Sequence, residues 1–222
     1  MRGLSRGFLP TIILLVCSVA SLCAGQSAPA AQGRKTSPPY TGDLTIFDSP
    51  GRDERLQIGR VMDILGIGEG KSVADIGAGS GWLTVRAARR VAQGGTVYAV
   101  DINPEAKQYV ERRAAKEHLG NVKAILSGAD DPMLPTNSVD AALLLKTYHE
   151  VENPVAMLRN LRPALRRGAR VGVIDRNGSA ENHGVNSEIV VKEAESAGYK
   201  VVGKYDFVKD GMDYFLVFQA KD

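Results

Sequence analysis

A glycine-rich turn between an apolar run and an amphipathic run is the feature that most constrains how this chain can fold. Residues 73–84 read VADIGAGSGWLT, with glycine at positions 77, 79 and 81. Glycine has no Cβ, so a backbone of this kind can pass directly against a ligand. The free N–H groups at the start of a following helix favour an anionic group at the same place. The segment therefore predicts a strand, a ligand-binding turn and a helix.

Apolar patterns along residues 51–222 alternate between strand and helix. The expected strands are 72–76, 96–101, 122–126, 139–145, 170–174, 199–207 and 214–219, and the expected helices are 52–65, 82–93, 104–118, 153–167 and 187–197. This alternation predicts a doubly wound α/β fold with a parallel sheet. The short connection at Asp210 and Gly211 requires an antiparallel hairpin between the last two strands. We expect a mostly parallel, seven-stranded sheet that ends in this hairpin.

The turn and the order of elements resemble the class I S-adenosylmethionine (SAM) dependent methyltransferases, whose first motif is hh-D/E-h-G-x-G-x-G. Dinucleotide-binding turns use G-x-G-x-x-G instead, and this chain has Trp82 at the third glycine of that pattern. The resemblance covers residues 51–218 and implies a Rossmann-like fold. It is greatest to the small-molecule, type 11-like branch, which includes exported predicted methyltransferases with a similar Tyr-His pair after the fourth strand.

The resemblance implies SAM as the cofactor. Asp75 would orient the glycine turn or take the ammonium group of SAM, directly or through water. Asp101 would accept hydrogen bonds from both ribose hydroxyls, as an acid does in dinucleotide sites; the other interpretation of Asp101 is a cap on the helix that begins at Pro104. The expected cofactor-binding residues are Asp75, Gly77, Ala78, Gly79, Gly81, Asp101, Ile102, Ala129, Asp130 and Lys146.

The adenine end departs from the family pattern. Many relatives have Gly-Asp where this chain has Gly128 and Ala129, and that acid meets the adenine amino group. Either Asp130 or the backbone N–H of Ala129 would serve the ring here, and Ile102 would pack on it.

The acceptor is expected beyond the fourth strand. Tyr148, His149 and Glu150 lie at the carboxyl edge of the sheet, where open α/β sheets bind ligands, and are the candidate catalytic residues. Methyl transfer depends mainly on positioning. A base is needed only when the acceptor loses a proton, and histidine is suited to that near neutral pH. The alternatives are that His149 fixes the loop and that Glu150 caps the helix near Pro154, and His183 is a weaker candidate.

Residues 1–25 have the pattern of a secretory signal peptide. Arg2 and Arg6 precede an apolar run over residues 8–24 that is followed by small residues. An uncleaved membrane anchor is the alternative, and both interpretations predict an exported protein, periplasmic or secreted. Cys17 and Cys23 lie in this segment, so the mature chain would have no disulfide, thiolate metal site or cysteine nucleophile. We expect no metal site, and we expect no membrane span once the signal peptide has been cleaved.

Residues 26–50 are rich in Ala, Ser, Gly and Pro and predict a flexible arm or linker, and residues 51–222 predict one SAM-binding domain. Without Arg2 and Arg6 the formal charge falls from +3 to +1. The sequence has no stripe of Lys and Arg interleaved with aromatic residues, so we do not expect nucleic acid as a partner.

The leading hypothesis is a SAM-dependent methyltransferase for a small-molecule acceptor. The alternatives are a non-catalytic SAM or nucleoside-binding module and, less favoured, an NAD-dependent oxidoreductase. The oligomeric state is not predicted.

Overall fold

The computed structural model describes residues 1, 3, 34–36 and 40–221. The predicted signal peptide, apart from Met1 and Gly3, and residues 26–33 and 37–39 of the predicted arm lie outside these ranges. Within the described ranges, no helix combines the length and apolar content needed to cross a bilayer.

Seven strands form one sheet in the order β3-β2-β1-β4-β5-β7-β6. They are β1 (Ser72–Ile76), β2 (Thr96–Asp101), β3 (Val122–Leu126), β4 (Val139–Leu145), β5 (Leu165–Asp175), β6 (Tyr199–Tyr205) and β7 (Tyr214–Ala220). The first five strands are parallel, whereas β7 is antiparallel to both β5 and β6. The predicted fold class and its terminal hairpin are confirmed.

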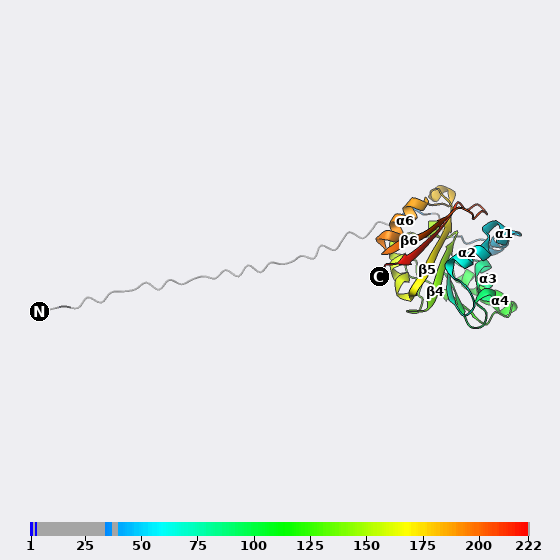
Figure 1. Ribbon diagram of the computed structural model, residues 1–222, viewed down its shortest axis with the longest axis horizontal. Coiled ribbons are helices and arrows are strands. Elements are labelled where there is room, and N and C mark those ends of the chain that lie inside the picture. The colour runs from blue at the N-terminus through cyan, green and yellow to red at the C-terminus, as the bar shows by residue number, and fades with distance from the viewer. Residues whose placement is uncertain (2, 4–33, 37–39, 222) are drawn as a thin grey trace. The chain divides into compact units, whose positions relative to one another are not determined.

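Helices cover both faces of the sheet (Figure 1). They are α1 (Arg52–Leu56), α2 (Ile58–Leu65), α3 (Trp82–Val91), α4 (Pro104–Lys116), α5 (Pro154–Leu161) and α6 (Ser187–Ser196). The central strand β4 is apolar on both sides: Leu143 and Leu145 pack in the core with α2 and α3, and Leu144 packs in the core with α5 and α6. This two-sided burial explains why β4 is a continuous apolar run.

Two predicted helices differ from the expectation in more than their last two residues. The predicted helix 52–65 is divided at Gln57, whose left-handed backbone (φ 48°) caps α1 and starts α2. The predicted helix 153–167 ends at Leu161, because Pro163 lies in a 3-10 turn and Leu165 is already extended. Strand β5 therefore begins five residues earlier than expected and pairs with β4 through an irregular register.

Residues 40–48, called the N-terminal segment below, lie against the domain at the carboxyl ends of the central strands. The segment contains a 3-10 helix (Leu44–Asp48) whose first turn is capped by the Asp43 carboxylate. Asp48 accepts hydrogen bonds from Ser80 and Arg113, so the segment is held to the glycine turn and to α4. Upstream, Arg34 donates to Glu193 and to the carbonyl of Tyr148.

Candidate active site

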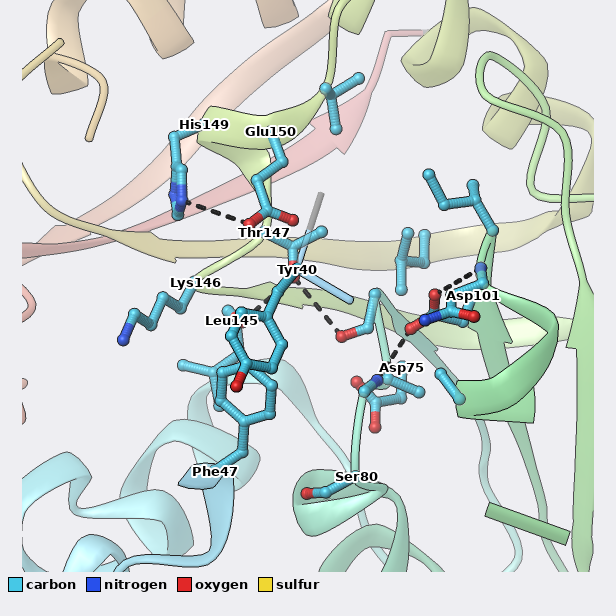
Figure 2. A pocket seen from close by; sticks show the side chains of 18 of the residues that line it. Tyr40, Phe47, Asp75, Ser80, Asp101, Leu145, Lys146, Thr147, His149 and Glu150 are labelled. Carbon is cyan, nitrogen blue, oxygen red and sulfur yellow. Dashed lines mark hydrogen bonds and ion pairs between the residues drawn. The ribbon is translucent and has the colours of Figure 1, made fainter. Parts of the chain in front are cut away.

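A cavity of about 670 Å³ lies at the carboxyl ends of β1, β2 and β4. Its walls come from the glycine turn, the residues after β4 and the N-terminal segment, which contributes Tyr40 and Phe47. Figure 2 shows Asp101 on one side of this cavity and His149 and Glu150 on another. Ligands of open α/β sheets bind at this edge, and the volume is typical of small-molecule sites.

The glycine turn needs its glycines for backbone conformation and for space. Gly77, Gly79 and Gly81 all have positive φ, at 74°, 53° and 73°. A Cβ on Gly77 would lie 2.3 Å from Cγ2 of Thr147, so no side chain fits there. Gly77 and Ala78 both donate to the carbonyl of Val100. The turn is thereby fixed to β2 and presents bare backbone to the cavity.

Gly81 does not line the cavity, contrary to the prediction. It is the residue before α3, and a Cβ at this position would lie 3.1 Å from Cγ2 of Val110 on α4. Gly81 therefore permits the close packing of α3 and α4, while Gly77, Ala78 and Gly79 form the cavity wall.

Asp101 ends β2 and holds the turn from the other side. Its Oδ2 accepts a 2.8 Å hydrogen bond from the N–H of Gly79, and its Oδ1 accepts one from the N–H of Asn103. The alternative interpretation of Asp101 as the helix cap is wrong, because Asn103 caps α4 through the N–H of Glu105. Asp101 lines the cavity with free acceptor capacity, as a ribose partner would require.

Asp75 lies below the turn and is 2% exposed. Its Oδ2 accepts a 2.6 Å hydrogen bond from Oγ1 of Thr84, which ties the end of β1 to α3. Burial raises the pKa of the Asp75 carboxyl to about 6, and this hydrogen bond only partly opposes the effect. The geometry fits the first predicted role of Asp75, the orientation of the turn.

Ile102, Ala129 and Lys146 line the cavity, as a cofactor role requires. Asp130 does not: its Oδ2 accepts a hydrogen bond from Asn153 at 3.2 Å, which turns the carboxylate toward the start of α5. Of Asp130 and Ala129, the two predicted hydrogen-bonding partners of adenine, only Ala129 therefore lines the cavity.

His149 is oriented by a buried carboxylate. Its Nδ1 lies 2.9 Å from Oδ1 and 3.0 Å from Oδ2 of Asp175, at the end of β5, and its backbone N–H donates to the same group. The two residues are 3% and 0% exposed. A carboxylate accepts hydrogen bonds, so Nδ1 carries the proton, and Nε2 of the neutral ring keeps a free lone pair.

Two further side chains meet His149 at this side of the cavity. Oε1 of Glu150 lies 3.8 Å from Nε2, and the ring of His183 lies edge-on to the His149 ring at 5.9 Å between centroids. Burial raises the pKa of Glu150 to about 7, opposed by His149 and reinforced by the carboxylates of Asp101 and Asp175. The cap on α5 proposed for Glu150 is not formed, because Asn153 directly precedes that helix.

Tyr148 lies outside the cavity, which corrects its prediction as an acceptor-contacting residue. Its side chain is fully buried in the core with α5 and α6, and its hydroxyl donates a 2.9 Å hydrogen bond to Glu193. Residues 148–150 form a 3-10 turn. Neighbouring side chains in such a turn point in different directions, so Tyr148 and His149 cannot share one wall.

Sequence reasoning missed two contributions to the cavity. The first is Asp175 as the partner of His149, which the parallel pairing of Leu145 with Ile174 brings beside the end of β4. The sequence signal that could have indicated this pairing is an acidic residue, Asp175, at the end of β5, the strand that pairs with β4. The second is the apolar wall from Leu44 and Phe47, which lie within residues 26–50, the predicted flexible arm or linker. Arg52 also lines the cavity; it lies over the Trp82 ring at 4.5 Å and is paired with Asp210.

Comparison with known proteins agrees with this geometry. The sequence model of a methyltransferase domain family matches residues 73–168, which contain the glycine turn, Asp101 and His149. A solved SAM-dependent methyltransferase from Aquifex aeolicus matches with a TM-score of 0.72 and 25% identity, over 80% of this chain and 98% of that one. Residues 73–168 thus match a methyltransferase domain, and the chain resembles the class I SAM-dependent methyltransferases in sequence and fold.

Curated methyltransferases match the central part of the chain. An uncharacterized methyltransferase of Mycobacterium tuberculosis is 38% identical over 104 residues, or 47% of this chain and 39% of the relative. Nocamycin O-methyltransferase of Saccharothrix syringae is 28% identical over 129 residues, or 58% of this chain and 46% of the relative. The chain therefore spans less than half the length of these curated relatives.

Proposed function

We propose that this protein transfers a methyl group from SAM to a small-molecule acceptor. The observation that carries the proposal is one continuous cavity, with the glycine turn and Asp101 in one part and His149 and Glu150 in another. A cofactor and an acceptor can thus lie side by side within one cavity, as a direct transfer between them requires.

The residues present fit SAM. Gly77 and Gly79 offer backbone without side chains, Asp101 offers carboxylate oxygens for two hydroxyls, and Ile102 offers an apolar surface for a purine ring. SAM supplies a methyl group on a sulfonium sulfur, which keeps the bonding electron pair when the acceptor takes the methyl. The protein's part is to hold the acceptor in line and to exclude water, and the apolar side chains of Leu44 and Phe47 in the N-terminal segment line the cavity.

The acceptor would lie against His149 and Glu150. These side chains are polar, whereas the adjoining Leu145, Val151 and Met157 are apolar. A small molecule with an apolar body and one or more polar groups suits this lining. The curated relative named for nocamycin O-methylation supports the same substrate class.

Binding and turnover measurements on the purified full chain test the proposal. Calorimetric titration should show binding of SAM and of its demethylated product at micromolar concentrations and no binding of NAD. Tritiated methyl-SAM should then label at least one member of a panel of phenols, catechols, thiols and amines. SAM binding without transfer to any acceptor would favour a non-catalytic binding module, and no SAM binding would overturn the cofactor assignment.

We also propose that the protein is exported. The support is the sequence pattern of residues 1–25, a basic start, an apolar run and small residues. Cell fractionation and N-terminal sequencing test it. The expected result is a non-cytoplasmic protein that begins close to Gln26, and a cytoplasmic protein with an intact N-terminus would overturn it.

A further inference from the structure

Three metal-ligating side chains meet at the acceptor side of the cavity. One nitrogen of His149, one carboxylate oxygen of Glu150 and one nitrogen of His183 all lie within 4.8 Å of one another. The residues come from two places, the turn after β4 and the loop after β5. Small side-chain rotations would bring three such atoms to the distance of about 2.0–2.2 Å from a shared ion that nitrogen and oxygen ligands adopt.

The geometry points to a divalent transition-metal site formed by His149, Glu150 and His183. Asp175 provides an independent second observation. It is fully buried, and both of its oxygens face Nδ1 of His149 at 2.9 and 3.0 Å. Metal-binding histidines usually donate their other ring N–H to a carboxylate in this way, which fixes the tautomer and strengthens the ligand. The lone pair of Nε2 is thereby directed toward Glu150 and the cavity.

The local charges favour a cation at this position. Glu150 is half-buried, and its carboxylate is repelled by those of Asp101 and Asp175. Among the described residues, Lys146 acts against this repulsion, and His149 does so only when its ring is protonated. A bound divalent ion would compensate for the buried carboxylates directly.

The loop that carries His183 is held in a defined conformation. His183 has a left-handed backbone (φ 53°), and its carbonyl accepts a hydrogen bond from Nε of Arg176. The preceding turn has a capping box between Ser179 and Asn182. The His183 ring is therefore placed beside His149 by several local interactions rather than by a free loop.

The ligand types indicate the metal. Two imidazoles and one carboxylate suit zinc, iron(II), manganese, cobalt or nickel, whereas magnesium and calcium prefer oxygen ligands alone. Three protein ligands leave coordination positions open on the cavity side. On the basis of the proposed function, the acceptor would bind the ion through an oxygen, so hydroxyl-bearing acceptors, vicinal diols and catechols among them, are the expected substrate class.

Cobalt(II) is the probe that tests the site. Tag-free full-length protein, stripped with a chelator, should bind one cobalt ion per chain and develop visible d–d absorption. The variants Glu150→Gln and His183→Ala should each weaken binding at least tenfold, and Asp175→Asn should weaken it by about 10–100-fold without removing a ligand. His118→Ala is the matched control, since His118 is the one histidine of the chain outside the cluster, and its binding should equal wild type.

The same samples distinguish this inference from the proposed function. No cobalt binding, or equal binding by wild type and His183→Ala, would overturn the metal site and leave Nε2 of His149 as a proton acceptor. SAM should bind the metal-free wild-type protein as tightly as it binds the cobalt-loaded protein. The reason is that the proposed metal ligands, His149, Glu150 and His183, lie in a different part of the cavity from Asp101. SAM binding without cobalt binding overturns the metal site alone, whereas cobalt binding without SAM binding overturns the proposed function alone.

Discussion

The hydroxyl of Tyr148 donates a 2.9 Å hydrogen bond to the carboxylate of Glu193, and Arg34 pairs with the same carboxylate at 3.1 Å. This contact joins the turn after β4 to α6 beneath the cavity. It assigns Tyr148 to the support of His149 rather than to contact with a ligand.

Replacement of Tyr148 by phenylalanine tests this assignment. Tyr148→Phe should lower the free energy of unfolding by about 1 kcal/mol, the net value of one hydrogen bond, because Glu193 keeps its pairing with Arg34. SAM affinity, measured by calorimetry, should equal wild type. A loss of SAM affinity with unchanged stability would place the Tyr148 hydroxyl in the binding site instead.

Loss of the Asp101 carboxylate should weaken SAM binding strongly. Hydrogen bonds to a charged group contribute about 1.5–3 kcal/mol each, so Asp101→Ala should lower the affinity at least tenfold. Part of this loss would come from the Gly79 N–H, which Asp101 also fixes. Glu105→Ala is the matched control, since it removes an exposed carboxylate of nearby α4. Equal affinities for wild type and Asp101→Ala would contradict the ribose assignment.

A methyl group at Gly77 should disrupt the turn. Gly77 has φ of 74°, and a Cβ would lie 2.3 Å from the Thr147 side chain. Gly77→Ala should destabilise the fold by about 1–3 kcal/mol and abolish SAM binding, as followed by thermal unfolding and calorimetry. Gly68→Ala is the control, because a Cβ added at Gly68 would meet no atom within 4 Å and its φ is not positive. Similar behaviour of both variants would show that the turn tolerates a side chain.

Asp75 should make stability depend on pH. Its pKa is about 6 in the folded protein and 3.8 ordinarily, so between these values the folded state holds a proton that the unfolded state has lost. Stability contributed by the protonated group is thus lost as the pH rises from about 4 to 6. The difference between the two pKa values corresponds to about 3 kcal/mol as an upper limit.

Asparagine at position 75 removes this titration. Without SAM, Asp75→Asn should be up to about 3 kcal/mol more stable than wild type at pH 7, provided its amide oxygen keeps the Thr84 hydrogen bond, and nearly equal to it at pH 4. Denaturant unfolding at both pH values measures this. Asp206→Asn, at an exposed position, is the control. A stability difference that does not change with pH would disprove the titration of Asp75.

The fold was predictable because its signals are local. The strand bounds Ser72–Ile76 and Val139–Leu145 follow from short apolar runs, and the hairpin follows from Asp210 and Gly211. Gln57 shows where this reasoning fails, since the helical pattern continues through it while its backbone is left-handed. At this division the carbonyl of Arg55 accepts a hydrogen bond from the N–H of Lys209, a long-range contact that no periodicity records.

The site was predictable only in part, for the same physical reason. The positions of Gly77, Gly79 and Asp101 depend on backbone turns that the sequence encodes nearby. The directions of Tyr148 and Asp130 depend on distant partners, Glu193 and Asn153, that only the folded chain brings close. The pairing of His149 with Asp175 likewise depends on the register of β4 and β5.

The cavity is assembled from parts of the chain with different degrees of family resemblance. Its glycine turn and Asp101 lie within residues 73–168, which match the methyltransferase domain family, whereas Tyr40, Phe47 and His183 lie outside that range. On the proposed function, the residues shared with the family would hold the cofactor, whereas Tyr40, Phe47 and His183 would shape the space left for the acceptor. A substrate predicted from residues 73–168 alone would therefore ignore part of the wall that the acceptor touches.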